Sequence, residues 1–231
     1  MSQFECQVTD ISPLTEVVYK VELAPAESIE FEAGQYIMVH MGENDKRPFS
    51  IANAAYDNKR IELHIGADES NTYATEVLDK MKSEGKVTLS GGHGHAHLRE
   101  GAMPKIVIAG GTGFSYAYSI VLQALHNDPN ANVTLYWGAK QKADLYLFDE
   151  ISGLAQKHKH FSFVPVVEEA DENWQGKTGW VHHAVLDDVA DFSSVQVYIA
   201  GRFEMAKTAR ADFTAKGLAL ENLFGDAYAF I

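Results

Sequence analysis

The stretch from residue 105 to residue 119 constrains the fold of this chain more than any other. A largely apolar segment, 105–109, precedes three glycines and a threonine, and a second largely apolar segment follows at 114–119. This order predicts a strand, a tight turn and a helix. Glycine permits positive φ and close approach to the backbone, and a helix N-terminus offers free N–H groups to a phosphate. The stretch is thus either a dinucleotide site or an ordinary strand-to-helix connection.

The glycine spacing departs from the standard dinucleotide fingerprint. Gly111 and Gly113 supply the first two glycines of G-x-G-x-x-G, but Tyr116 stands at the third position. The turn by itself therefore does not decide between the two interpretations.

From Gly101 onward, segments with strand and helix patterns alternate. Such alternation predicts a parallel sheet with helices on its faces, a doubly wound α/β domain. The expected strands are 105–109, 132–137, 161–167 and 195–200.

The first hundred residues instead show short apolar runs separated by turn residues, at 17–23, 35–41, 60–65 and 86–90, and the run at 60–65 alternates strictly. This pattern predicts a small antiparallel β-barrel or sandwich. One helix is expected at 73–82, capped by Asn71 or Thr72, with Ala74, Val77, Leu78 and Met81 on its buried face. Glycine and polar residues cluster near 95–103, so we expect a barrel at 1–98 and an α/β domain at 99–231.

Composition limits the partners and the location of the protein. A net charge of −13 disfavours nucleic acid and anionic membranes, which the average field of the protein repels. Cys6 is the single cysteine and cannot form an internal disulfide, and no run approaches the roughly 18 apolar residues of a spanning helix. The amino terminus shows no signal-peptide pattern. We therefore expect a soluble cytoplasmic protein.

The segment 47–50 combines a guanidinium, a proline, an aromatic ring and a hydroxyl. A flat polar ring bound against a strand needs a face to rest on and a hydrogen-bond donor at its edge, and an arginine can serve an anion. Composition alone favours the simpler interpretation, a polar turn that enters a strand with Phe49 in the core.

Four segments, in order, resemble the signatures of the ferredoxin–NADP reductase superfamily. Residues 47–50 resemble its R-x-[YF]-S flavin motif, and residues 110–114 resemble its nicotinamide nucleotide motif. Residues 198–205 resemble the third signature, and the chain ends in a similar aromatic segment at 224–231. The combination is most similar to the bacterial NAD(P)H:flavin oxidoreductases, which include the enzymes that supply reduced flavin to luciferase in luminous bacteria.

This resemblance implies a barrel that holds a flavin, an α/β domain that holds NAD(P)H, and hydride transfer from nicotinamide C4 to flavin N5 between them. It implies that Ser50 is the catalytic residue at N5, that Arg47 lies near the ribityl chain or phosphate, and that Phe230 guards the ring face. The other flavin contacts it implies are Tyr36, Pro48, Phe49, His64, Ile65, Gly66, Ala67, Thr112 and Ser115. The NAD(P)H contacts it implies are Gly110, Gly111, Thr112, Gly113, Phe114, Trp137, Gly138, Gly201, Arg202, Phe203 and Met205.

Two departures from the superfamily pattern refine these expectations. Relatives that retain FAD use a phosphate site at the start of the barrel helix, but here Asp68 and Glu69 precede that helix, and carboxylates repel a phosphate. We therefore expect riboflavin, FMN and FAD to act as exchangeable substrates in a ternary complex with a sequential mechanism. Ala200 stands where many superfamily members have a cysteine, so no thiol at this position can assist near the nicotinamide. Because the cofactor carries the chemistry, we expect loss of Ser50 to slow turnover without abolishing it.

The preferred nucleotide is weakly encoded. No acidic residue ends the second parallel strand, and Lys140 and Lys142 follow it, either as acceptors for a 2′-phosphate or as solvated surface. We expect use of both NADH and NADPH. A flavin-dependent oxygenase or luciferase is the expected downstream consumer, reached by diffusion.

Two rival functions remain open. One is a reductase with tightly bound flavin that passes electrons to a protein acceptor, and the other is a non-catalytic dinucleotide-sensing module. A metal site is not expected. His93, His95 and His97 alternate along a glycine-rich segment, which either converges on a metal or, as we favour, lies at the surface or between domains.

Overall fold

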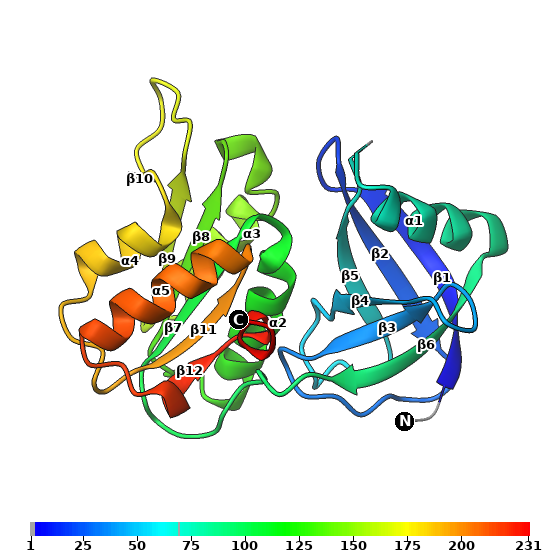
Figure 1. The fold of residues 1–231 in the computed structure, drawn as a ribbon, viewed down its shortest axis with the longest axis horizontal. Coiled ribbons are helices and arrows are strands. Elements are labelled where there is room, and N and C mark those ends of the chain that lie inside the picture. Colours follow the sequence, from blue (N-terminus) through cyan, green and yellow to red (C-terminus); the bar gives the residue numbers. More distant parts are fainter. Residues whose placement is uncertain (1–2, 69) are drawn as a thin grey trace.

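A computed structural model describes residues 3–68 and 70–231 and folds them into two sheet-based halves that lie side by side (Figure 1). The first half is an antiparallel sheet with one helix, and the second is a parallel sheet with helices on both faces. The predicted fold class, a β-barrel followed by a doubly wound α/β domain, is confirmed.

The first sheet has the order β4-β3-β6-β1-β2-β5, and every neighbouring pair is antiparallel. Apolar residues of all these strands enclose one core, which includes Cys6, Ile37 and Leu63. Beyond the end of β4, the Ala52 N–H donates to the Glu62 carbonyl of β5 over 2.8 Å, so the two outer strands approach each other as in a barrel. The strands are β1 (Gln3–Pro13), β2 (Val18–Pro25), β3 (Tyr36–His40), β4 (Lys46–Ser50), β5 (Ile61–Gly66) and β6 (Lys86–His93).

Helix α1 (Thr72–Glu84) lies across this barrel as the sequence predicts. The Asn71 side chain accepts a hydrogen bond from the Ala74 N–H over 3.2 Å and thereby satisfies one free donor of the first turn. Gly85 ends the helix in the left-handed conformation. The predicted buried face is confirmed in full: Ala74, Val77, Leu78 and Met81.

The second sheet has the order β10-β9-β8-β7-β11-β12, and all of its pairs are parallel. Along β7, Val107 and Ala109 pack with helices α2 and α3, whereas Ile106 and Ile108 pack with α4 and α5. The strands are β7 (Lys105–Gly110), β8 (Val133–Ala139), β9 (Phe161–Val167), β10 (Lys177–Thr178), β11 (Gln196–Ala200) and β12 (Leu223–Phe224). The helices are α2 (Phe114–Asn127), α3 (Phe148–Lys157), α4 (Val181–Asp188) and α5 (Phe203–Ala215). Short 3-10 turns are η1 (Gly111–Gly113), η2 (Lys142–Asp144), η3 (Leu220–Asn222) and η4 (Asp226–Ala229).

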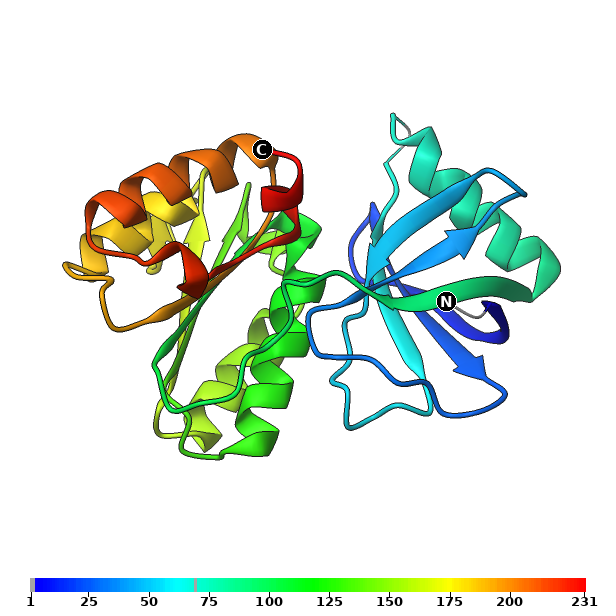
Figure 2. The same ribbon diagram turned by 60° about the horizontal axis from the view of Figure 1, so that its bottom comes forward.

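Helix α2 joins the two halves, and both ribbon views place it beside the barrel (Figures 1 and 2). The Ser119 hydroxyl donates to the Asn53 carbonyl over 2.8 Å, and the Tyr116 hydroxyl donates to the Ala96 carbonyl over 2.6 Å. Farther along the helix, the His126 ring stacks on Tyr56 with centroids 4.1 Å apart. These contacts hold the halves together along one side and leave their other side to form a groove.

Strand β5 is buried on both sides. Strict alternation of apolar and polar residues is typical of a strand with one exposed face, yet all residues from Ile61 to Ile65 are buried. Ile61, Leu63 and Ile65 fill the barrel, while Glu62 and His64 face the second half of the chain. Strand β5 is covered by the barrel core on one side and by the second half on the other, yet its alternating sequence is that of a strand with one side in water.

Candidate functional site

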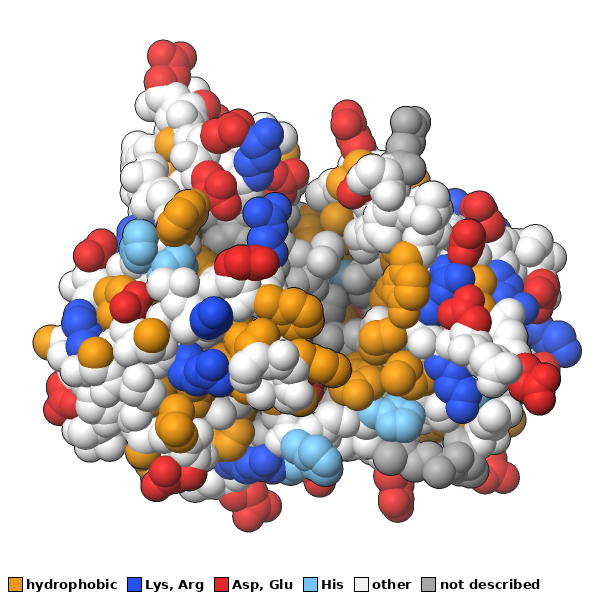
Figure 3. All heavy atoms as spheres, in the orientation of Figure 1, with side chains coloured by type: hydrophobic (Ala, Val, Ile, Leu, Met, Phe, Trp, Pro, Cys, Tyr) orange, Lys and Arg blue, Asp and Glu red, His pale blue; other side chains and the backbone are white. Residues whose placement is uncertain are grey.

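The two halves meet at the ends of β5 and β7. A Cβ atom on Gly66, the last residue of β5, would lie 3.0 Å from the Thr112 methyl group, which belongs to the turn after β7. Apolar side chains gather along the groove between the halves on the face shown in Figure 3. Gly66, a predicted flavin contact, and Thr112, a predicted contact of both flavin and NAD(P)H, therefore lie next to each other where the two halves meet.

The predicted flavin motif is itself strand β4 and not a turn that enters a strand. Ser50 pairs with Tyr36 of β3, so these two side chains are cross-strand neighbours. Pro48 is exposed, whereas Phe49 packs against the barrel core. The simpler interpretation was therefore right about the Phe49 side chain, which faces the core.

Arg47 is buried and already has partners on every side. Its guanidinium donates to Asp45 over 2.6 and 3.0 Å, to Glu76 over 2.7 Å and to the Tyr73 carbonyl over 2.6 Å. It also lies 4.6 Å from the centroid of the Tyr73 ring. The hydrogen bonds that Arg47 donates to Asp45 and Glu76 raise its pKa further above its usual value. The cation predicted to meet a ribityl chain or phosphate is thus neutralised by two carboxylates of the protein.

The predicted flavin wall at 64–67 divides into different roles. The His64 ring is fully buried between the halves, and Ile65 lies in the barrel core. The Ala67 N–H donates to the Val17 carbonyl over 2.7 Å. Of this segment, Gly66 presents bare backbone to the groove beside Thr112.

The glycine turn has the geometry of a site that admits a ligand. Gly111 adopts φ +55° and has open space where a Cβ would lie, and Thr112 is exposed. A Cβ on Gly113 would lie 2.6 Å from the Ala200 carbonyl oxygen, so only glycine allows the start of α2 to approach β11 so closely. Met205 covers Gly110, lying 3.3 Å from its Cβ position, and also covers Gly201.

The side chains of Phe114 and Trp137, two of the predicted NAD(P)H contacts, are fully buried. Their rings stack with centroids 3.6 Å apart, and the Trp137 indole N–H donates to the Gly111 carbonyl over 3.1 Å. They support the glycine turn from beneath. Ser115 is likewise buried and donates to the Thr112 carbonyl over 3.3 Å, while Gly138 lies against Val181 at the start of α4.

The chain end returns to the barrel and brings one residue that sequence reasoning missed. A Cβ on Gly94 would lie 3.0 Å from Asp226 Oδ1 and 3.1 Å from the Tyr36 ring, so carboxyl and ring are neighbours there. Burial raises the pKa of Asp226 to about 6, and the nearby charge of His95 opposes this shift. An aspartate inside the aromatic C-terminal signature was the available sequence signal. Phe230 is 76% exposed, and its ring centroid lies 6.1 Å from that of the half-exposed Phe203. Arg202, which precedes Phe203, is also exposed.

The three alternating histidines have separate surroundings. The His93 ring stacks on Tyr36 with centroids 5.6 Å apart, His95 is exposed, and the His97 ring lies beside Arg99. Within 3–68 and 70–231, no group of three or more His, Cys, Asp or Glu side chains is arranged to hold a metal ion.

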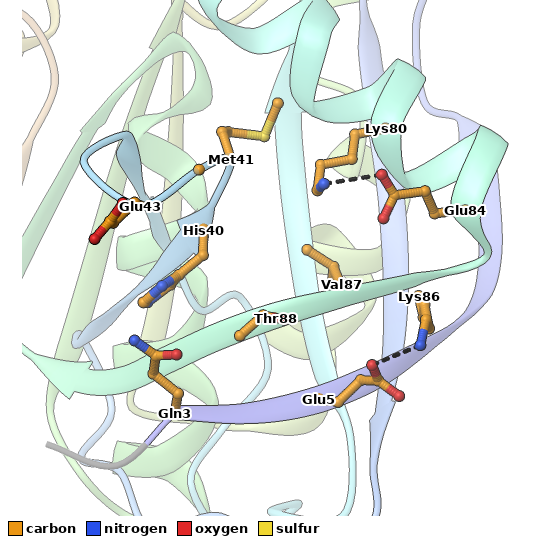
Figure 4. A pocket seen from close by; sticks show the side chains of 11 residues that line it. Gln3, Glu5, His40, Met41, Glu43, Lys80, Glu84, Lys86, Val87 and Thr88 are labelled. Carbon is orange, nitrogen blue, oxygen red and sulfur yellow. Dashed lines mark hydrogen bonds and ion pairs between the residues drawn. The ribbon is translucent and has the colours of Figure 1, made fainter.

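A surface pocket on the outside of the barrel is separate from this groove (Figure 4). It is lined by polar residues of β1, β6 and α1, and its two lysines are paired: Lys80 with Glu84 at 2.9 Å and Lys86 with Glu5 at 2.8 Å. No helix in the described part of the chain is long and apolar enough to cross a membrane.

Comparison with known proteins assigns the family. A family model described as "Oxidoreductase FAD-binding domain" matches residues 6–98, and one described as "Oxidoreductase NAD-binding domain" matches residues 107–211. The chain is 46% identical to an NAD(P)H-flavin reductase of Aliivibrio fischeri, with 98% of each chain covered, and 45% identical to an NAD(P)H-flavin reductase of Vibrio harveyi, with 98% of this chain and 99% of the relative covered. The chain belongs to the NAD(P)H-flavin reductase family of oxidoreductases.

Solved structures agree with the fold of this family. The cytochrome b5 reductase domain of Ulva prolifera nitrate reductase superposes with a TM-score of 0.83 at 15% identity, with 96% of each chain covered. The predicted resemblance to NAD(P)H:flavin oxidoreductases is confirmed by the near full-length match to the bacterial relatives.

Proposed function

We propose that the protein is an NAD(P)H:flavin oxidoreductase that binds flavin and NAD(P)H together at the groove between its halves and releases the reduced flavin. Family membership supports NAD(P)H-dependent flavin reduction. The observation that carries a shared site is the contact of Gly66 and Thr112, because it joins the wall predicted for flavin to the turn predicted for pyrophosphate. The family models also support the proposed division near residue 98.

The residues at the groove fit a flat ring and a dinucleotide. Ser50, the last residue of β4, and Tyr36, the first residue of β3, offer hydroxyl groups, and Gly66 offers bare backbone. Gly111 offers an open backbone at the start of α2, where free N–H groups favour a phosphate. Bound here, the nicotinamide supplies the hydride at C4 and the flavin accepts it at N5, while the protein aligns the two rings.

The surroundings of Arg47 support flavin as an exchangeable substrate. A cation strengthens the binding of the phosphate of FMN or FAD, but the Arg47 guanidinium is already bonded to Asp45 and Glu76. Asp68 adds a further carboxylate before α1, its pKa lowered by hydrogen bonds from Ser70, while Glu69 lies outside the described residues. The flavin is then held by its ring and ribityl chain, without a phosphate requirement. Released reduced flavin reaches a luciferase or another flavin-dependent oxygenase by diffusion.

Initial-rate kinetics test the ternary complex. We expect double-reciprocal plots at several flavin concentrations to intersect when NADH is varied, because both substrates are bound at the moment of transfer. Parallel lines would contradict the proposal and indicate a flavin that stays bound and cycles between two forms.

A further inference from the structure

A buried hydrogen bond joins the two halves directly behind the groove. The Tyr146 hydroxyl, from the segment between β8 and α3, lies 3.2 Å from His64 Nδ1 on β5. The same imidazole bonds through Nε2 to Glu62 Oε1 over 2.9 Å, and its side chain is fully buried. His64 is therefore fixed at both ring nitrogens, once within the barrel and once across the interface.

The proton positions on this imidazole follow from its partners. Burial raises the pKa of Glu62, but hydrogen bonds from His64 and Arg60 outweigh this and lower it to about 2, so the carboxylate is ionised and only accepts. His64 Nε2 must then carry a hydrogen. Burial raises the pKa of Tyr146, so its hydroxyl keeps its proton and is the donor to His64 Nδ1 whenever that nitrogen carries no hydrogen.

Aromatic contacts extend this link to the glycine turn. Tyr146 meets the rings of Phe114 and Trp137 edge-on, with centroids 5.6 and 5.0 Å away. Trp137 in turn holds the Gly111 carbonyl through its indole N–H. A continuous set of packed groups thus connects β5, which ends at Gly66, with the turn that contains Gly111.

We propose that His64 and Tyr146 are positioning residues that fix the glycine turn of the NAD(P)H-binding half against the flavin wall of the barrel. Neither side chain needs to touch a substrate for this role. The contact sets the separation of two surfaces that carry the hydride donor and acceptor, and an error of about 1 Å in such an alignment costs about a hundredfold in rate. This inference rests on the proposed reduction of flavin by NAD(P)H.

The test compares two tyrosines of the same aromatic cluster. Tyr146→Phe removes the hydroxyl that crosses the interface, whereas Tyr118→Phe removes one that bonds to Glu150 within the second half. Tyr118 also stacks on Phe114, with centroids 5.3 Å apart, and is buried, so it is a matched control for lost packing and stability. The measurements are kcat, the KM values for flavin and NADH, and the deuterium isotope effect with NADH labelled at C4.

For Tyr146→Phe we expect kcat to fall about tenfold, a larger isotope effect on kcat, and flavin KM within about twofold of the wild type. Tyr118→Phe should keep kcat within about twofold. His64→Leu should lower kcat as well, and adding Tyr146→Phe to it should cause no further loss, because both changes remove one contact.

Three outcomes would overturn the positioning role. The first is an unchanged kcat in Tyr146→Phe, the second is an equal loss in Tyr118→Phe, and the third is a raised flavin KM at unchanged kcat, which would indicate direct flavin binding. A wild-type protein that does not oxidise NADH in the presence of flavin would instead reject the proposed function itself.

Discussion

The Thr112 methyl group lies 3.0 Å from the point that a Cβ atom on Gly66 would occupy. This distance is shorter than ordinary van der Waals contact, so a Cβ at residue 66 requires the Thr112 side chain to move by a few tenths of an ångström. The two residues belong to different halves of the molecule and close the floor of the groove between them.

Gly66→Ala should therefore lower kcat about threefold to tenfold while leaving the fold intact, since Thr112 is exposed and able to shift. Steady-state kinetics with riboflavin and NADH measure this effect. Adding Thr112→Ser removes the methyl group and keeps the hydroxyl, so the double variant should regain most of the lost rate. No recovery would show that the close contact is not the cause.

Ser50→Ala should lower kcat about tenfold without abolishing turnover, because the hydride passes between the two cofactor rings and the hydroxyl only assists alignment at the acceptor. Ser90→Ala is a suitable control, since this serine lies on β6 of the same barrel and its hydroxyl bonds to His40 over 3.0 Å. Complete inactivity of a folded Ser50→Ala protein would assign the hydroxyl an essential chemical role.

Glu76→Gln should make the protein favour phosphorylated flavins. The change removes one of the two carboxylates that neutralise Arg47 and leaves the guanidinium more positive toward a phosphate. We expect the KM for FMN to fall about threefold or more while the KM for riboflavin stays constant. Asp79→Asn removes an equal charge from an exposed position of α1 and should change neither value. If Glu76→Gln changed the KM values for FMN and riboflavin by the same factor, the phosphate would not bind near Arg47.

The pairing of Lys140 predicts the direction of nucleotide preference. Lys140 follows β8, where a dinucleotide fold meets the adenosine ribose, but its Nζ lies 3.4 Å from Glu169 Oε1, and Glu168 is next to that residue. Glu169→Gln should raise kcat/KM for NADPH about fivefold relative to NADH, by removing a charge that repels a 2′-phosphate through water. An equal change in kcat/KM for NADH and NADPH would contradict a role of Glu169 in nucleotide preference. Glu172→Gln in the same loop removes an equal charge and is the control.

Asp226 should make the stability of the protein depend on pH. Its pKa is raised by burial from 3.8 to about 6, so the folded state holds this proton more tightly than the unfolded state does. For an acid shifted upward, stability is lost as pH rises from about 4 to about 6, because the ionised carboxylate is disfavoured in the fold. Asp226→Asn should therefore melt above the wild type at pH 7, and the difference should vanish near pH 3.5. A difference in Tm that does not change with pH would contradict the shifted pKa.

Local sequence patterns predicted much of this fold, and long-range contacts account for the rest. Asn71 as a cap, the buried face of α1 and the strand before Gly110 follow from rules that act within a few residues. The burial of Glu62 and His64 does not, since it depends on which half of the chain covers β5. Apolar and polar residues alternate along β5 in the same way whether its outer face meets water or the second half of the chain.

The same division holds for the site. The resemblance names Ser50 and Tyr36, which are cross-strand neighbours, and Gly66 and Thr112, which lie next to each other, but it does not tell that the side chains of Trp137 and Phe114 are buried in the core. Their apolar bulk was compatible with either location. Asp226 reaches Tyr36 only because the chain end folds back on the barrel, and no spacing in the sequence encodes that return.

The most direct test of the proposed function is the visible spectrum of the purified, desalted protein, followed by NADH oxidation with and without added riboflavin. We expect little absorbance at about 450 nm and NADH oxidation only when flavin is supplied, because the Arg47 guanidinium is already paired with Asp45 and Glu76. A yellow protein that oxidises NADH and reduces dyes without added flavin would contradict the account and identify a tightly bound flavin cofactor.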